Sequence, residues 1–366
     1  MTSLANGVFD ILREGNTGKP NILVLTEHVN ATYFISFDRP LGAMHGRGEL
    51  NFAVASQARV DDFGLQAWDI IRSRFRPDLV VFTRFGLPSG VAFMRLARNK
   101  CVPVVYHIDD DLLDLPDSLG ADIMQRNGSL QVKEARRELL SNADLVYAST
   151  AALAERMRTR FPHRDIFHGI YASYPGDVDA ASGNAARVIG YMGSRGHAQD
   201  LELVVPALCR LMTRMPELRF ETFGTIAMPQ ALAPFGPRVT SHPVSKSYGA
   251  FLEQLSRLSW AVGLAPLVDE PFNRCKAPTK FIEYTAAGIP VVASDVVVYR
   301  DVVSESGGGV LVGDDWETAI DGMLESPGKS VEMVKAARNY CRSRFAPELL
   351  EAQLRTAMAR VGVRCP

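Results

Sequence analysis

Short apolar runs rich in valine and isoleucine alternate with longer amphipathic segments through most of the chain, and this alternation constrains the fold more than any other feature. Such runs are typical of strands buried on both faces, and their alternation with helices indicates parallel sheets. In the first half we expect strands at residues 21–26, 78–83, 102–106 and 143–148, and helices at 90–100, 132–142 and 151–161.

A stretch of small and polar residues, 171–187, interrupts this pattern and is the best candidate for a linker between two domains. The alternation then restarts, with strands expected at 188–192, 218–223, 260–265 and 290–293, and helices at 200–215, 246–258, 279–287, 316–325 and 331–346. We therefore predict an α/β protein with one domain at 20–170, a second at 188–345, and a final helix in 346–366 that packs back toward the first domain. The carboxyl ends of the two parallel sheets would face a cleft, the usual ligand position in open α/β sheets.

The composition is that of a soluble globular protein long enough for two cores. The 366 residues are 47% hydrophobic and 22% charged, with a net charge of -1, so no basic excess predicts a nucleic-acid partner. Five scattered cysteines without a CxxC pair favour reduced thiols over disulfides or a zinc site. No apolar run reaches the roughly 18–20 residues of a membrane span, and residues 1–19 are expected to be a flexible leader rather than a secretion signal. We expect a cytoplasmic protein, with peripheral contact at the inner face of the membrane left open.

The segment 273–294, NRCKAPTKFIEYTAAGIPVVAS, predicts a short loop, a helix, a turn and a buried strand. Lys276, Thr279 and Lys280 stand at the start of that helix, where unpaired N–H groups and the helix dipole attract phosphate. Glu283 lies one turn further on the face of Lys280 and can accept hydrogen bonds from vicinal hydroxyls such as those of a ribose. Tyr284 follows it. The segment therefore predicts a nucleotide diphosphate site, although an ordinary core helix would show the same amphipathic pattern.

A glycine-rich turn, GYMGSRGH at 190–197, follows the first strand of the second half and precedes a helix. Glycine lets the backbone approach a ligand closely, and the N–H groups of the next helix face that ligand. We place Gly193, Ser194, Arg195 and His197 in the same donor site, while a tight turn without a ligand is the alternative.

His107 ends the strand at 102–106, and a polar residue at that end of a parallel strand is expected to point into the cleft. Asp109, Asp110 and Asp111 follow it. They can bind a divalent metal on a diphosphate or form a turn that caps the next helix, and we prefer the cap because no further metal ligands are evident. The segment 27–48 is expected to be a long loop, either functional, with aromatic residues that stack on a sugar or hold a lipid, or simply packed on the surface.

The residues of the second half resemble a known family. The segment 276–294, KAPTKFIEYTAAGIPVVAS, with YRDVV at 299–303 and GGVLV at 308–312, is similar to the C-terminal domain of GT-B glycosyltransferases, and the nearest group is the bacterial family 4 retaining enzymes. The resemblance implies two Rossmann-like domains, a sugar-nucleotide donor bound by the C-terminal domain, an acceptor on the N-terminal side, and no need for a metal or other cofactor.

The resemblance also implies roles for single residues. Glu283 matches the second glutamate of the family's E-x7-E motif, which holds the donor ribose, and His107 matches a histidine that contacts the transferred sugar. Gly193 matches the glycine beside the diphosphate. Cys275 stands where the family has its first glutamate. The arginine and lysine that the family has after the first C-terminal strand are absent in that spacing, which leaves Arg195 and His197 there. The glycine-rich turn after the first N-terminal strand is replaced by Thr-Glu-His-Val.

We accordingly expect a retaining glycosyltransferase of bacterial surface polysaccharide or glycoconjugate synthesis, with His107, Lys280 and Glu283 in catalytic roles. The leaving phosphate would accept the proton of the acceptor hydroxyl, as the resemblance implies. The acceptor is a glycan, a lipid-linked molecule or a small molecule. Two alternatives stay open: a sugar-nucleotide epimerase of the same fold, which would need acid and base carboxylates such as Asp109–Asp111, and a non-catalytic glycan- or nucleotide-binding relative, which Cys275 suggests.

Overall fold

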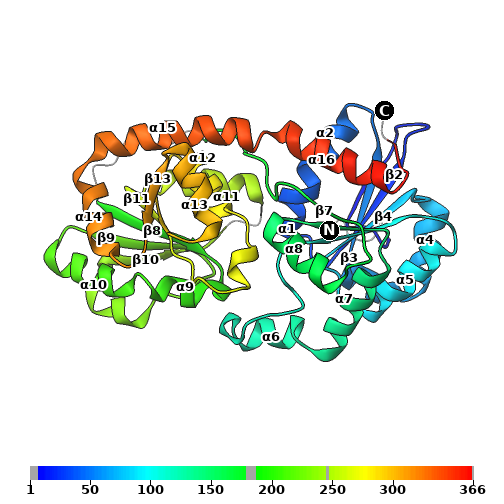
Figure 1. Cartoon of the computed structure of the whole chain (residues 1–366), viewed down its shortest axis with the longest axis horizontal. Coiled ribbons are helices and arrows are strands. Elements are labelled where there is room, and N and C mark those ends of the chain that lie inside the picture. Colours follow the sequence, from blue (N-terminus) through cyan, green and yellow to red (C-terminus); the bar gives the residue numbers. More distant parts are fainter. Residues whose placement is uncertain (1–6, 179–186, 245–246, 365–366) are drawn as a thin grey trace.

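The computed structural model describes residues 7–178, 187–244 and 247–364, and places them in two α/β halves that lie side by side (Figure 1). The strands of the N-terminal half are β1 (Ile11–Arg13), β2 (Asn21–Thr26), β3 (Asn51–Ser56), β4 (Leu79–Thr83), β5 (Val104–Ile108), β6 (Leu145–Ala148) and β7 (Ile166–His168). Their order is β1-β3-β2-β4-β5-β6-β7, and all neighbours are parallel except β1 and β3.

The C-terminal half contains a second, fully parallel sheet. Its strands are β8 (Val188–Gly193), β9 (Arg219–Gly224), β10 (Val239–His242), β11 (Val262–Ala265), β12 (Val291–Ser294) and β13 (Gly309–Val312), in the order β10-β9-β8-β11-β12-β13. In each sheet the chain leaves its first parallel strand to one side and later returns to the other side. This reversal opens a crevice beside the carboxyl ends of β2 and β4, and of β8 and β11. The α/β class with two parallel sheets is as predicted.

Helices cover both sheets. Those of the N-terminal half are α1 (Ala31–Tyr33), the π-helix η1 (Phe34–Asp38), α2 (Arg39–Gly46), α3 (Gln57–Phe63), α4 (Gln66–Arg74), α5 (Pro88–Arg98), η2 (Asp117–Leu119), α6 (Ala121–Asn127), α7 (Leu130–Asn142) and α8 (Ala151–Arg160). Those that follow are η3 (Arg195–His197), α9 (Ala198–Glu202), α10 (Val205–Arg214), η4 (Gln230–Arg238), α11 (Tyr248–Arg257), η5 (Asn273–Cys275), α12 (Thr279–Ala286), α13 (Val297–Ser306), α14 (Trp316–Glu325), α15 (Pro327–Arg344) and α16 (Pro347–Arg360).

Three expectations need correction. The segment 27–48 is not a loop but forms α1, η1 and α2, because its apolar residues pack beneath the sheet: Tyr33, Phe37 and Leu41 are buried. The helix expected at 200–215 is two helices, and the second begins with a proline in its first turn. Residues 7–19 are part of the fold, since β1 pairs with β3 and Val8 and Phe9 are buried. The rest of the expected leader, 1–6, lies outside the described residues.

The two halves also contact each other. Helix α16 crosses to the N-terminal half in Figure 1 and lies against α2 and β6, where Gln353 bonds to both backbone groups of Ile170 at 2.7 and 2.8 Å. Phe272 and Cys275 of the C-terminal half are buried in the core cluster of the N-terminal half, and Ile35 is buried in that of the C-terminal half. Of the expected linker, residues 171–178 are described and 179–186 are not. The crevice is thus closed on several sides by residues of both halves.

Candidate active site

A cavity of about 190 Å³ lies where the carboxyl ends of the two sheets meet. Arg84, Asp109 and Asp110 line it from the N-terminal half, and Lys276 and Lys280 line it from the C-terminal half. A neighbouring cavity of about 240 Å³ shares Arg84, Asp110 and Lys276 and continues along an apolar wall that includes Leu115 and Ile123. Charged groups of both signs therefore face one enclosed space between the two halves.

The start of α12 brings its predicted residues together. Lys276, Thr279 and Lys280 all line the smaller cavity. Burial lowers the pKa of Lys280 to about 8, and its ammonium lies 5.5 Å from the centre of the Tyr191 ring. The Lys276 ammonium lies 4.4 Å from the centre of the Phe272 ring. Two cations that lose hydration in a cavity at a helix N-terminus form a site suited to a phosphate group.

The turn after β8 contributes to the same cavities, with one exception. Gly193 allows the tight turn because an added Cβ would lie 2.9 Å from the Tyr191 ring, and Ser194 and His197 line the larger cavity. The Nδ1 atom of His197 lies 2.8 Å from Asp200, and the charge of Lys280, followed by burial, lowers the pKa of His197 to about 4. His197 is therefore neutral at pH 7. Arg195 is exposed and lies 3.9 Å from Asp122, outside both cavities, and its contact with the donor stays a prediction.

Arg84, directly after β4, is the central cation of the N-terminal side, and the sequence analysis did not identify it. Its guanidinium lies 3.1 Å from Glu27, 2.8 Å from Asp109 and 3.3 Å from Asp110. Its backbone adopts φ 56, a left-handed conformation unusual for a residue other than glycine. Arg84 directly follows the carboxyl end of β4, the same kind of position that led us to select His107 from the sequence. This position could have identified Arg84 as a candidate site residue.

Asp109, Asp110 and Asp111 form neither a helix cap nor a metal cluster, because the next helix begins at Asp117 and each carboxylate pairs with other groups. Asp109 accepts hydrogen bonds from Thr32 and Tyr171 at 3.1 and 3.4 Å, and Asp111 pairs with arginines of α8. Burial raises the pKa of Asp109, whereas the charges of Lys276 and Arg84 outweigh burial and lower that of Asp110. Within residues 7–178, 187–244 and 247–364, no three His, Cys, Asp or Glu side chains are grouped to hold a metal ion.

His107 does not face the cleft. It is buried in the core beneath the N-terminal sheet, where its Nδ1 atom lies 2.9 Å from the Thr83 hydroxyl. Phe37 and Tyr147 contact the ring edge to face at 4.9 and 5.0 Å between ring centres. Burial and the charge of Arg84 lower its pKa to about 3. His107 lies on the face of β5 that carries Val105, and this face packs against Phe37 and Tyr147. The structure therefore places His107 in the core and not in the cavity, against its predicted contact with the sugar.

Glu283 and Tyr284 are both buried. Tyr284 is fully buried and joins two strands, because its hydroxyl accepts from the Met192 N–H at 2.8 Å and donates to the Leu264 carbonyl at 3.1 Å. It is a core residue and not a ligand contact. Glu283 is buried and accepts a hydrogen bond from Tyr248, and burial raises the pKa of Glu283 to about 7.

Comparisons with known proteins agree with this geometry. A family model described as a glycosyl transferase 4-like domain matches residues 36–168. Among solved structures, sucrose-phosphate synthase from Thermosynechococcus elongatus is 13% identical with a TM-score of 0.66, over 94% of this chain and 99% of that one. Anabaena HepE in complex with UDP-glucose is 15% identical with a TM-score of 0.62, over 93% and 99%. No curated protein matches the chain in a sequence search.

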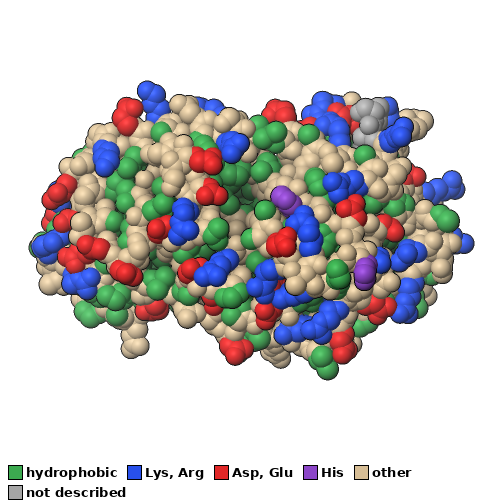
Figure 2. Space-filling view, viewed as in Figure 1, with side chains coloured by type: hydrophobic (Ala, Val, Ile, Leu, Met, Phe, Trp, Pro, Cys, Tyr) green, Lys and Arg blue, Asp and Glu red, His purple; other side chains and the backbone are tan. Residues whose placement is uncertain are grey.

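These matches show the fold. The chain has the GT-B fold of known glycosyltransferases, and its residues 36–168 match a glycosyl transferase 4-like domain. The predicted resemblance and fold are thereby confirmed. Among the helices that the structure describes, none has the length and apolar character needed to cross a bilayer. Acidic and basic side chains are interspersed over the face of the molecule shown in Figure 2, in keeping with its net charge of -1.

Cys275 does not line the cavities described above. It is 1% exposed and packs in the core cluster of the N-terminal half, and its carbonyl accepts from the Thr150 hydroxyl at 2.8 Å. Burial raises the pKa of its thiol to about 11. The residue at the family's first glutamate position therefore joins the two halves.

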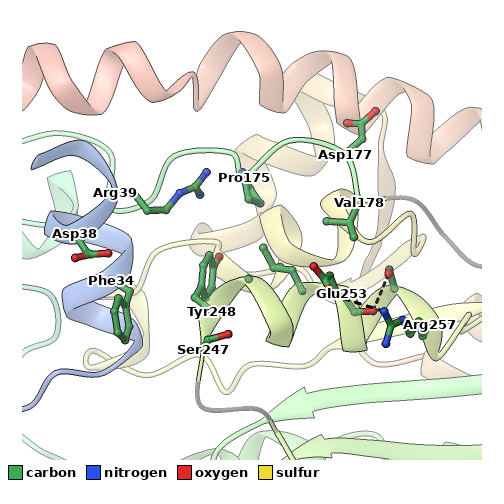
Figure 3. A pocket seen from close by; sticks show the side chains of 13 residues that line it. Phe34, Asp38, Arg39, Pro175, Asp177, Val178, Ser247, Tyr248, Glu253 and Arg257 are labelled. Atoms are coloured by element: carbon green, nitrogen blue, oxygen red, sulfur yellow. Dashed lines mark hydrogen bonds and ion pairs between the residues drawn. The ribbon is translucent and has the colours of Figure 1, made fainter. Parts of the chain in front are cut away.

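A third and larger cavity, about 710 Å³, lies between η1, α11 and the segment after Tyr174. Figure 3 shows Tyr248 at the start of α11, facing Phe34 and Arg39 across this space. The Tyr248 hydroxyl donates a hydrogen bond to Glu283. Tyr248 thus separates the buried carboxylate from an open cavity.

Proposed function

We propose that this glycosyltransferase moves a sugar from a nucleotide-diphosphate-sugar donor to an acceptor hydroxyl. The observation that carries the proposal is the cavity of about 190 Å³ in which Lys276 and Lys280 face Arg84 and two carboxylates across the interdomain crevice. A phosphate-attracting wall on one side and hydroxyl-accepting groups on the other match the two substrates of a glycosyl transfer. HepE in complex with UDP-glucose has the same fold, which supports a sugar-nucleotide donor.

The C-terminal half would hold the donor. We assign the diphosphate to Lys276, Thr279 and Lys280, with Ser194 and His197 beside it. Glu283 would accept hydrogen bonds from the ribose once Tyr248 gives up its contact, which places the nucleoside next to the cavity of about 710 Å³. The N-terminal half would hold the acceptor, since Asp109, Asp110 and Thr32 line the opposite wall.

The chemistry would be mainly electrostatic. As the bond from the anomeric carbon to the diphosphate oxygen breaks, negative charge develops on the leaving group, and Lys280 and Lys276 stabilise it in a site with little water. The acceptor oxygen forms the new bond, and its proton passes to the leaving phosphate, with retention at the anomeric carbon. The lysines rather than a metal ion would meet the diphosphate charge. Full activity in EDTA would support this, and loss of activity in EDTA with recovery on Mg²⁺ would contradict it.

The setting that fits this reaction best is synthesis of a bacterial surface polysaccharide or glycoconjugate in the cytoplasm, with peripheral contact at the inner face of the membrane. The acceptor would be a glycan, a lipid-linked molecule or a small molecule. The neighbouring cavity with its apolar wall at Leu115 and Ile123 offers room beside the reacting groups for the acceptor.

A binding screen followed by a transfer assay tests the proposal. UDP, GDP, dTDP and ADP are added separately to the full chain, and the ligand that raises its melting temperature identifies the nucleotide. The matching sugar nucleotides are then incubated with and without acceptors, and released nucleotide and new glycoside are measured. Absence of any nucleotide response would refute the proposal. An isomerised sugar without acceptor would instead show an epimerase.

A further inference from the structure

The two lysines of the diphosphate site are in different states. Lys276 forms an ion pair with Asp110 across the crevice, with 3.2 Å between Nζ and Oδ1, and its side chain is 16% exposed. Lys280 makes no ion pair within 4.0 Å among the residues described, and its nearest ring contact is Tyr191. Lys276 is therefore paired with a protein carboxylate, whereas the Lys280 ammonium lines the cavity without an ion-pair partner in the part of the chain that is described.

The charges around Lys276 explain why its ammonium stays paired with Asp110. On the N-terminal side, the carboxylates of Glu27, Asp109 and Asp110 surround the single guanidinium of Arg84. Arg136, which bonds to the Arg84 carbonyl, also acts on Glu27, and Lys276 from the other half supplies the cation that pairs with Asp110. Asp110 is the carboxylate that Arg84 and Lys276 share, with 3.3 Å to Arg84, so it keeps one partner if Lys276 leaves.

We propose that Asp110 is a positioning residue that takes the place of the donor diphosphate on Lys276, and that the diphosphate must displace it. This inference rests on the proposed function and adds to it. In the empty enzyme the Asp110–Lys276 pair keeps the ammonium in the cavity and bridges the two halves. When the diphosphate binds, Lys276 exchanges one anionic partner for another, and Asp110 is left with Arg84 and a free lone pair that faces the acceptor side.

The exchange predicts an unusual effect of mutation. Asp110→Asn keeps the shape of the side chain but removes the competing charge, so the dissociation constant of the nucleoside diphosphate should fall about tenfold, the order of coupling found between adjacent charged groups. Asp110→Glu restores the charge and should return the affinity toward that of the wild type. Asp114→Asn is the matched control, because Asp114 lies in the same loop, is 65% exposed and pairs only with arginines of α8.

A double-mutant cycle separates exchange from simple repulsion. If Asp110 acts through Lys276, the gain from Asp110→Asn disappears in a Lys276→Met background. If Asp110 only repels the phosphate, the same gain persists in that background, and the proposal is overturned. In the transfer reaction, Asp110→Asn should lower the donor KM without raising kcat.

A comparison of two lysine variants tests the idea without changing Asp110. Lys280→Met should weaken diphosphate binding by about a hundredfold, because it removes a desolvated cation that has no protein partner. Lys276→Met should weaken binding by less than about tenfold, because Lys276 already has a carboxylate partner to give up. Equal losses would contradict the exchange. If wild type and all variants bind no nucleotide, the proposed function fails; if wild type binds and Asp110→Asn binds no tighter, only this inference fails.

Discussion

Lys280 offers the sharpest test of the donor site, because the same charge that would bind a diphosphate also lowers the stability of the empty protein. Burial lowers the pKa of Lys280 from 10.5 to about 8, with the charge of Lys276 adding to the effect. A difference of this size corresponds to about 3 kcal/mol between the two protonation states. Since side chains relax and water enters real proteins, we expect Lys280→Met to raise the free energy of unfolding at pH 7 by about 1–2 kcal/mol.

The direction with pH follows from the same values. Below pH 8 the lysine is charged in both the folded and unfolded states, so the full penalty is present at pH 7. Between pH 8 and 10.5 the folded protein binds fewer protons, so the stability of the wild type rises with pH relative to that of the variant. Affinity for a nucleoside diphosphate should fall over the start of this window, as the ammonium loses its proton.

Thermal unfolding at pH 7 and pH 9.5, with and without the nucleotide identified in the screen, measures both effects. Lys280→Met should unfold about 1–3 °C higher at pH 7 and lose the shift caused by the nucleotide. Lys335→Met, on the exposed face of α15, is the matched control and should change neither. A Lys280→Met protein that is less stable, or that keeps the full nucleotide shift, would refute the assignment of Lys280 as a desolvated phosphate-binding cation.

Three further predictions concern the neighbouring residues. The pKa of Glu283 is raised to about 7, so the free energy of unfolding of the wild type should fall as the pH rises from 4.5 to 7. Urea unfolding measured at each pH should show no such fall for Glu283→Gln. Tyr284→Phe should lower the free energy of unfolding in urea by about 1–3 kcal/mol, because the Met192 N–H loses its buried partner. The nucleotide dissociation constant of this variant, measured by calorimetry, should stay within about twofold of the wild-type value. Cys275→Glu should cost about 3–5 kcal/mol, since it buries a second carboxylate near Asp111, and a transfer assay should show no gain in activity.

The sequence by itself determined the class of the fold and half of the site. The alternation of valine-rich runs with helical segments indicates parallel sheets, because helices that connect parallel strands cover both faces of the sheet and bury the strands between them. The residues at the start of α12 were predicted correctly to lie together in the cavity, since a helix N-terminus and its lysines form a local feature within a few residues.

Only the tertiary structure decided what faces the crevice. His107 and Tyr284 are polar residues at plausible positions, yet strand pleat and helix rotation direct both side chains into cores. Arg84 and Asp110 enter the site because the strand order places the ends of β4 and β5 next to each other, and the partner of Asp110 comes from residue 276, 166 positions away along the chain. Contacts of this range depend on how two sheets are closed against each other, and no local pattern in the sequence carries that information.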